Sequence, residues 1–351
     1  MQIITVTPET SVSGDFHCLQ DAINSIPFAN QEPIRIELDP GVYHEKLTLD
    51  KPFVTLVGMG QAPEDTIISY DDFGNDTMPD GTRRGTFRSY TLFVHANDVV
   101  LRNLTVENAS GDSITHGQAI ALYAECDRFF VDSCRLLGHQ DTLFTGPLPP
   151  KELQPNGFLG PTQFAPRING RQYYKNCYIC GDVDFIFGSA TAYFEHCTLE
   201  SLRRSNADDT NPAVASDAKS FSPEGYVTAA STPEGQTYGY VFASCDFISR
   251  DCPPATVYLG RPWRNYAKTV LIDCALGAHI HPAGFHDWNK PQAHESIFYA
   301  EYKSHCEADL YPPYSHRADF VRTLDTVQAS YFSKENVLSG VDGWHPFECV
   351  V

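Results

Sequence analysis

Two aspartates in apolar surroundings are the residues of this 351-residue sequence best suited to chemistry. Asp184 lies in segment 181–190, GDVDFIFGSA, and Asp141 lies in segment 138–144, GHQDTLF. Two nearby carboxylates in a partly apolar cleft cannot both ionise easily, so their pKa values are driven apart. One would remain a nucleophile or base while the other keeps a proton to donate. Ordinary solvated turns are the alternative, and the apolar residues around Asp184 disfavour it.

Two glutamines stand close to these carboxylates in the sequence. Gln140 directly precedes Asp141, and Gln118 lies in segment 116–120, HGQAI. Both are neutral donors suited to a developing oxyanion. Adjacent residues of a strand point to opposite faces, so Gln140 and Asp141 can share a site only at a strand end or a bulge. The turn-forming Gly138 makes such a site reasonable.

A third segment, 259–264 with the sequence LGRPWR, supplies a fixed positive charge and an aromatic face. Arg261 can hold a carboxylate in a bidentate fork and keep it ionised. Trp263 can present its ring to a sugar. A purely structural stack of the two side chains is an equally good interpretation of these six residues.

The sequence predicts no metal and no cofactor. The histidine-rich segment 279–286, HIHPAGFH, is not accompanied by an HExxH pattern. Cys177 and Cys180 have C-x-x-C spacing, but no second pair stands at zinc-finger distance. A G-x-S-x-G elbow is missing, and segment 58–60 lacks the third glycine of a dinucleotide fingerprint.

Composition limits the partners. The 25 basic and 44 acidic residues give a net charge of −19, which argues against nucleic acid and anionic membranes as partners. Plain solubility is the simplest explanation of this charge. A hydrophobic content of 42% is ample for a core, and no apolar run reaches membrane-spanning length.

A short repeat determines the predicted fold. The pattern apolar-x-x-Cys-x-apolar recurs around five cysteines, with a sixth copy carrying Leu104 in the same slot: Cys134, Cys177, Cys197, Cys245 and Cys274. Self-similar short units without helical periodicity indicate the coils of a β-solenoid. Cysteine then serves as a small buried hydrophobe stacked from coil to coil. The 20 residues between Cys177 and Cys197 are a minimal coil.

Longer intervals between repeats contain inserted loops. Segment 146–166 holds six prolines, and segment 203–225 is polar, so both are expected to form walls of a cleft. An apolar face over 18–26, ended by Pro27, predicts a helix that caps the solenoid. Segment 309–351 is expected to pack along the outside. Repeats flank each loop, so residues 1–351 are predicted to be one domain.

The three segments, in this order, resemble the signature segments of pectin methylesterases, and the resemblance spans nearly the whole chain. Further similar pieces are 14–16 (GDF), 19–23 (LQDAI), 41–45 (GVYHE), 58–60 (GMG), 103–108 (NLTVEN), 280–284 (IHPAG) and 343–346 (GWHP). The resemblance implies an all-β, right-handed parallel β-helix that hydrolyses galacturonate methyl esters without a metal. Its substrate would be methyl-esterified homogalacturonan or its oligosaccharides.

The resemblance also implies a role for each matching residue. Asp184 would attack the ester carbonyl, and Asp141 would protonate the departing methanol and then activate water. Gln118 and Gln140 would stabilise the oxyanion, and Arg261 would orient Asp184. Substrate binding is assigned to three aromatic residues: Trp263, Phe187 and Phe185.

Some positions depart from the family pattern. Tyr123 stands where many members have arginine, and Phe285 where many have tryptophan, so these positions put nearby substrate contacts in doubt. The insert 146–166 is longer than in common members. Two other functions share the predicted fold: a polygalacturonase-like glycosidase, which has no use for the glutamines, and a non-catalytic pectin-binding β-helix.

Location and assembly are expectations only. The first sixteen residues contain no lysine, arginine or apolar leader core, and eleven thiols suit a reducing interior. We therefore expect a cytoplasmic monomer. The alternative is a secreted protein whose leader is missing from this sequence.

Overall fold

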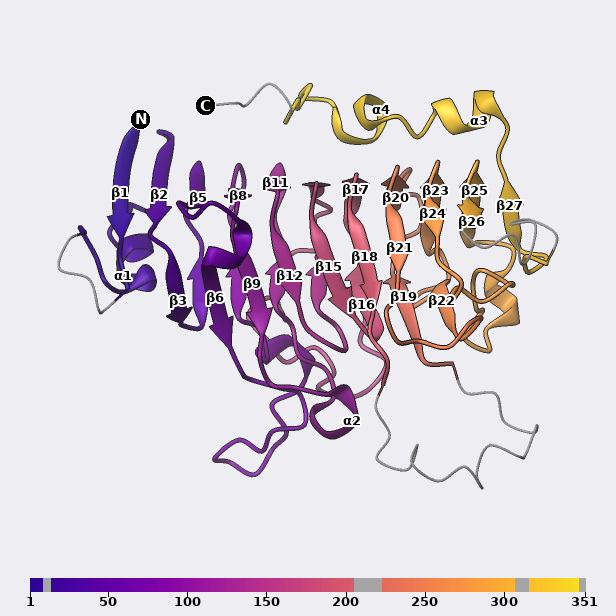
Figure 1. Cartoon of the computed structure of the whole chain (residues 1–351), viewed down its shortest axis with the longest axis horizontal. Coiled ribbons are helices and arrows are strands. Elements are labelled where there is room, and N and C mark those ends of the chain that lie inside the picture. The colour runs from indigo at the N-terminus through magenta and orange to yellow at the C-terminus, as the bar shows by residue number, and fades with distance from the viewer. Residues whose placement is uncertain (9–13, 205–222, 307–315, 347–351) are drawn as a thin grey trace.

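Strands dominate the computed structural model, which describes residues 1–8, 14–204, 223–306 and 316–346. They form three parallel sheets stacked along one long axis (Figure 1). Successive strands of the chain pass from one sheet to the next and return to the first sheet one coil later. The predicted all-β, right-handed parallel β-helix is confirmed.

Sheet A runs the length of the solenoid. Its strands, in spatial order, are β1 (Gln2–Val6), β2 (Ile34–Leu38), β5 (Val54–Gly58), β8 (Val100–Arg102), β11 (Phe129–Asp132), β14 (Arg171–Lys175), β17 (Thr191–Glu195), β20 (Tyr240–Ala243), β23 (Lys268–Ile272), β25 (Phe298–Tyr302) and β27 (Val321–Thr323). Spatial order equals chain order, so each coil adds one strand to the same end of the sheet.

Sheets B and C complete each coil. Sheet B contains β3 (Gly41–His44), β6 (Thr66–Tyr70), β9 (Thr105–Asn108), β12 (Arg135–Leu137), β15 (Tyr178–Gly181), β18 (Thr198–Ser201), β21 (Asp246–Ile248), β24 (Ala275–Leu276) and β26 (His305–Cys306). Sheet C contains β4 (Leu47–Leu49), β7 (Leu92–Val94), β10 (Leu122–Ala124), β13 (Leu143–Thr145), β16 (Val183–Gly188), β19 (Gly225–Ala230) and β22 (Val257–Gly260).

The cysteine repeat marks the bend between sheets A and B. The residue before each repeated cysteine has a left-handed backbone, with φ between 51° and 55°: Ser133, Asn176, His196, Ser244 and Asp273. Asn103, before Leu104, has φ 51°. The bend turns the following side chain inward, and all five cysteines belong to the main core. The predicted ladder of buried cysteines is therefore confirmed.

Aromatic rings continue this coil-on-coil stacking inside the solenoid. The Tyr174 and Phe194 rings stack with centroids 4.7 Å apart, and Phe194 and Phe242 follow at 4.5 Å. Parallel in-register pairing places equivalent side chains of neighbouring coils directly over one another. The same rule positions the functional residues.

Short helices cover parts of the solenoid: α1 (Leu19–Asn24), α2 (Ser113–His116), α3 (Thr326–Ser330), α4 (Lys334–Leu338), and the 3₁₀ turns η1 (Pro63–Asp65), η2 (Thr86–Arg88) and η4 (Pro291–Ala293). Helix α1 is shorter than the predicted 18–26 but packs on β1 and β4 at the N-terminal end. The Glu45 carboxylate accepts hydrogen bonds from the Leu19 and Gln20 backbone N–H groups.

After β27, the last strand of sheet A, the described residues 324–346 of the C-terminal segment lie along the outside of that sheet, as predicted (Figure 1). Helix α4 contacts β14 and β17, and its Val337 and Leu338 join an outer apolar cluster with Tyr173 and Tyr193. Of the predicted loop 203–225, residues 205–222 lie outside the described part of the chain. No described helix is both long and apolar enough to cross a membrane.

The cysteine ladder generates a prediction about thiol reactivity. The five ladder cysteines are at most 2% exposed, so a thiol reagent cannot reach them in the folded protein, whereas Cys18 and Cys252 are only partly buried. In the native protein, a thiol reagent should therefore label Cys18 and Cys252 long before the ladder cysteines. Mass spectrometry of labelled peptides measures this order, and unfolding in urea provides the fully labelled control. Equal labelling rates would contradict the buried ladder.

Candidate active site

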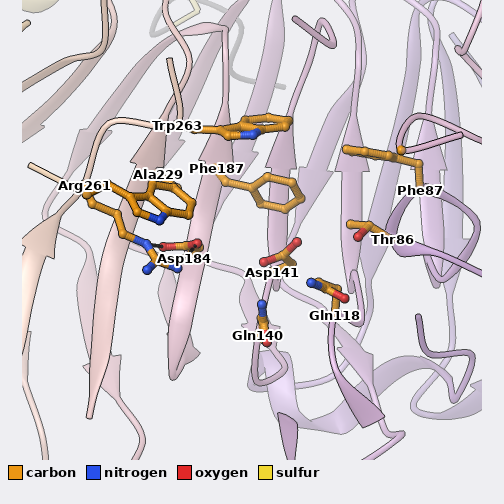
Figure 2. A pocket seen from close by; sticks show the side chains of 12 residues that line it. Thr86, Phe87, Gln118, Gln140, Asp141, Asp184, Phe187, Ala229, Arg261 and Trp263 are labelled. Atoms are coloured by element: carbon orange, nitrogen blue, oxygen red, sulfur yellow. Dashed lines mark hydrogen bonds and ion pairs between the residues drawn. The ribbon is translucent and has the colours of Figure 1, made fainter. Parts of the chain in front are cut away.

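A cleft of about 220 Å³ lies on the sheet C side of the solenoid and is lined by all the candidate site residues from the sequence except Phe185. It is lined by Thr86, Phe87, Gln118, Gln140, Asp141, Gly157, Asp184, Phe187, Ala229, Arg261, Trp263 and Trp288. In Figure 2 the carboxylates lie in the middle, the glutamines lie below them, and the Trp263, Phe187 and Phe87 rings lie above.

Asp141 and Asp184 occupy equivalent positions on adjacent coils. Strand β13 pairs with β16 so that Leu143 faces Ile186, a spacing of 43 residues that also separates the two aspartates. The Asp141 backbone N–H donates to the Val183 carbonyl at 3.1 Å. Each carboxylate is about nine-tenths buried, with 7% and 6% exposure. Tertiary register therefore brings two sequence-distant carboxylates together.

Both aspartates have a left-handed backbone conformation, with φ 68° at Asp141 and 52° at Asp184. Asp141 precedes strand β13, and the register between β16 and β19 shifts between Val183 and Ile186. These irregularities allow adjacent residues to depart from strict alternation, so Gln140 and Asp141 both line the cleft. Gln140 and Asp141 therefore lie just before a strand, which is where two adjacent residues can share one site. Such strained positions cluster at functional sites.

Arg261 holds Asp184 and not Asp141. Its Nε donates to Asp184 Oδ1 at 2.8 Å, and its Nη2 donates to Oδ2 at 2.7 Å. The guanidinium itself lies between the Tyr226 ring at 3.9 Å and the Trp288 ring at 3.7 Å. The bidentate geometry and the two aromatic faces fix the arginine and therefore the carboxylate.

This one-sided contact separates the protonation states of the two carboxylates. Burial raises the pKa of Asp141 well above its usual value, and the Asp184 charge raises it further. Burial also raises the pKa of Asp184, but the Arg261 charge and hydrogen bonds oppose that effect. Asp184 is therefore the group that ionises first, and Asp141 is the group that keeps its proton.

The two glutamines stack on adjacent coils in the same manner. Gln118 and Gln140 form a parallel backbone bridge, and the Ala119 N–H donates to the Gln140 carbonyl at 3.0 Å. Both side chains are half-buried and line the cleft near Asp141 (Figure 2). Two amide donors beside the carboxylates are suited to holding an oxyanion.

Two of the three aromatic residues assigned to substrate binding line the cleft. Trp263 and Phe187 line it, with ring centroids 5.8 Å apart. Phe185 does not: it is fully buried in the main core. The assignment of Phe185 to substrate binding is therefore wrong, because Phe185 points into the solenoid while Asp184 and Phe187 line the cleft.

Sequence reasoning missed Trp288 and Tyr226. Trp288 lines the cleft, and both rings flank the Arg261 guanidinium. The available signal was the rarity of tryptophan, of which the chain has three. Tyr226 carried no distinguishing signal, because it lies in an ordinary strand, β19, and reaches Arg261 only through the fold.

Asp182 is a third buried carboxylate that sequence reasoning did not use. It accepts a hydrogen bond from Ser113 Oγ at 2.6 Å and from the Val183 N–H at 2.6 Å, and His139 Nδ1 lies 3.4 Å away. Ser113 begins the short helix α2, which ends two residues before Gln118, and His139 directly precedes Gln140. Asp182 therefore links the three turns that carry the glutamines and Asp184.

The two departures from the family pattern are both buried outside the cleft. The Tyr123 hydroxyl lies 2.5 Å from Thr162 Oγ1, and the Phe285 ring stacks on Tyr299 at 4.2 Å. Within the described residues, no three His, Cys, Asp or Glu side chains gather as they would around a metal ion. Burial lowers the pKa of His279 to about 4, so this member of the histidine-rich segment is neutral near pH 7.

The chain was compared with known proteins. A family model described as Pectinesterase matches residues 4–147 and 167–340. Pectinesterase 31 of Arabidopsis thaliana is 32% identical over 298 residues, which cover 83% of this chain and 79% of that protein. Putative pectinesterase 11 of the same plant is 29% identical over 349 residues, covering 98% and 81%.

Solved structures agree. A pectin methylesterase in complex with a hexasaccharide is 28% identical, with a TM-score of 0.74 and 99% of both chains covered. Pectin methylesterase PemA from Erwinia chrysanthemi is 28% identical, with a TM-score of 0.73 and 98% of both chains covered. The resemblance found in the sequence is confirmed. Most of the proline-rich insert falls in the gap between the two matched ranges.

The raised pKa of Asp141 generates a stability prediction. Its carboxyl ionises near pH 4 in the unfolded chain and at higher pH in the folded protein. In that interval the folded state binds more protons, so this group makes stability fall as pH rises. Asp141→Asn removes this titrating group and with it the fall in stability that the group causes. The melting temperature of Asp141→Asn should therefore rise relative to the wild type between about pH 4 and pH 7.

Asp246→Asn is the matched control, because Asp246 is exposed at the start of β21. Its melting temperature should follow the wild type at every pH, as measured by scanning calorimetry. A pH-independent difference for Asp141→Asn would show that Asp141 is ionised in the folded state.

Proposed function

The chain belongs to the pectinesterase family, and we propose that it hydrolyses galacturonate methyl esters in pectin, releasing methanol and a free carboxylate. One observation carries the proposal: two buried carboxylates lie on adjacent coils, and an arginine fork holds only one of them. That arrangement provides an ionised nucleophile next to a protonated acid without a metal.

In the proposed reaction, an Asp184 oxygen attacks the ester carbonyl carbon. The carbonyl electrons move to oxygen, and the resulting oxyanion accepts hydrogen bonds from Gln118 and Gln140. The bond to the methoxy group then breaks, and Asp141 gives its proton to the leaving methanol. An acyl-enzyme on Asp184 remains, and Asp141 is now ionised.

Water completes the cycle. The Asp141 carboxylate takes a proton from water, the hydroxide attacks the acyl carbon, and the bond to Asp184 breaks. Asp184 leaves as a carboxylate, which Arg261 holds, and Asp141 regains its proton. Arg261 serves both steps because it keeps the Asp184 carboxylate oriented and favours its charged form.

The sugar ring is proposed to lie against Trp263, which is half-buried and exposes part of its ring to the cleft. The Phe187 ring packs against Trp263 at a tilt, with the two centroids 5.8 Å apart. An aromatic face adjacent to the carboxylates places the sugar's ester group over Asp184.

Substitution of the carboxylates tests this function. Asp184→Ala and Asp141→Ala should each lower kcat for methanol release from methylated pectin at least about a thousandfold, because members of one catalytic unit fail together. The double variant should be barely worse than either single variant. Asp246→Ala, at an exposed position, should retain wild-type turnover. More than a few per cent of activity in Asp184→Ala would remove it as the nucleophile.

The net charge of −19 supports a second proposal about substrate form. Each ester cleaved adds a negative charge that the protein field repels, so highly methylated chains should be preferred. Initial rates on heavily and lightly methylated pectin should differ at low salt and converge as salt screens the field. Equal rates at low salt would contradict the charge argument and leave the esterase proposal standing.

We also propose that the protein acts as a monomer in a reducing compartment. The ten described cysteines are free thiols, and seven of them are buried. Size-exclusion chromatography with light scattering, together with thiol counting in cell extracts, tests both statements. A stable dimer or several disulfides would overturn the corresponding one.

A further inference from the structure

The proline-rich insert 146–166 borders the candidate cleft, and its residues 148–166 lie outside the ranges matched by the family model. We propose that the insert determines substrate affinity by holding the ring of Trp263 in position for the sugar. This inference rests on the proposed esterase function and adds to it a specificity element in a segment that the family model does not match. Three sets of contacts support it.

Arg167, the residue that directly follows the insert, binds both ends of it. The Arg167 guanidinium donates to the carbonyls of Thr162 at 2.9 Å, Ala165 at 2.7 Å and Gln163 at 2.8 Å. It also donates to the Pro149 carbonyl at 3.3 Å, at the opposite end of the segment. Together with its prolines, this arginine makes the insert a defined structure and not an open loop.

A buried polar contact attaches the insert to the solenoid. Thr162 is 1% exposed, and its hydroxyl donates to Glu125 Oε2 at 2.6 Å. The Tyr123 hydroxyl lies 2.5 Å from the same threonine oxygen. Tyr123 and Glu125 belong to the coil that also carries Gln118. The Tyr123 hydroxyl thus has one partner in the insert, Thr162, and one in its own coil, Glu125 at 3.4 Å.

The insert reaches Trp263 through an aromatic contact. Phe158 is 6% exposed, and its ring meets the rings of Trp263 and Phe87 edge-on, at centroid distances of 6.3 and 5.8 Å. A side chain at Gly160 would overlap Phe87, so the insert lies directly on that residue. Arg264, next to Trp263, donates to the Lys151 carbonyl at 2.8 Å.

Three rings contact the ring of Trp263: Phe158 of the insert at 6.3 Å, Phe187 at 5.8 Å and Phe87 at 6.5 Å between centroids. Its backbone is held separately, because Lys290 Nζ donates to the Trp263 carbonyl at 3.3 Å and the Pro262 carbonyl at 2.7 Å. Asp141 and Asp184 are positioned independently of the insert, by the pairing of β13 with β16. Loosening the insert should weaken sugar binding while leaving the chemical step nearly unchanged.

Phe158→Ala is the principal test. It should raise KM for methyl-esterified oligogalacturonate about threefold to tenfold, with kcat within about twofold of the wild type. Tyr123→Phe, which keeps the ring and removes only the hydroxyl that faces Thr162, should change KM in the same direction. The control is Phe164→Ala, because Phe164 lies in the same insert and is 92% exposed. Its kinetics should match the wild type.

A double-mutant cycle with Trp263→Ala decides whether the insert acts through the tryptophan. If it does, Phe158→Ala should change KM little in the Trp263→Ala background. An equal KM change in both backgrounds would overturn the proposal, as would an unchanged KM in both Phe158→Ala and Tyr123→Phe. Melting temperatures identify any variant that has lost its fold, and the Tyr123→Phe result then stands alone.

Failure of the esterase function would be recognised separately. If the wild type releases no methanol, the proposed function falls. The same cycle is then measured as dissociation constants for methyl-esterified oligogalacturonate by isothermal titration calorimetry, which does not depend on the tryptophan that the cycle removes. Weaker binding in Phe158→Ala that disappears in the Trp263→Ala background supports the role of the insert, and unchanged binding overturns it.

Discussion

In-register pairing of parallel coils is the constraint on which the structure depends. Backbone hydrogen bonds between coils fix each residue directly over its counterpart one coil earlier. In the core this pairing stacks cysteines and aromatic rings. At the surface of sheet C it places Asp184 over Asp141 by the same mechanism, while the backbone bridge pairs Gln118 with Gln140. The same stacking of coils therefore builds the core at most positions and the candidate site at these few positions of sheet C.

The departure is electrostatic as well as geometric. Two carboxylates stacked in a buried position would both tend to be neutral. Arg261 prevents this at Asp184, because its guanidinium donates hydrogen bonds to that carboxylate alone. The rings of Tyr226 and Trp288 hold the guanidinium in place. The asymmetry between otherwise equivalent coil positions is what allows one aspartate to serve as nucleophile and the other as acid. Arg261 directly follows β22, which lies two coils beyond β16, the strand that carries Asp184.

The insert shows how such a solenoid acquires a feature of its own. A coil tolerates a long insertion between strands because the strands on either side keep their register. The insert is attached through Thr162, closed by Arg167 and connected to the cleft through Phe158. Tyr123 belongs to the same feature, because its hydroxyl contacts Thr162 of the insert.

The sequence by itself determined the repeat, and with it the solenoid, because one short pattern recurs around the cysteines and periodicity is a local property. It also determined the residue types of the site, since an aspartate among apolar residues and an arginine near a tryptophan are visible without coordinates. Together, these features and the family resemblance were sufficient for the fold and for most residues of the candidate site.

Only the tertiary structure decided which side chains meet. It brought Trp288 and Tyr226 to Arg261, and it linked Asp182 to Ser113 and His139. It also turned Phe185 into the core and Phe187 into the cleft, because the register shift between Val183 and Ile186 interrupts the regular alternation of the strand. These outcomes depend on coil register and on backbone φ at single residues. Both are set by contacts between distant segments, which a linear pattern does not contain.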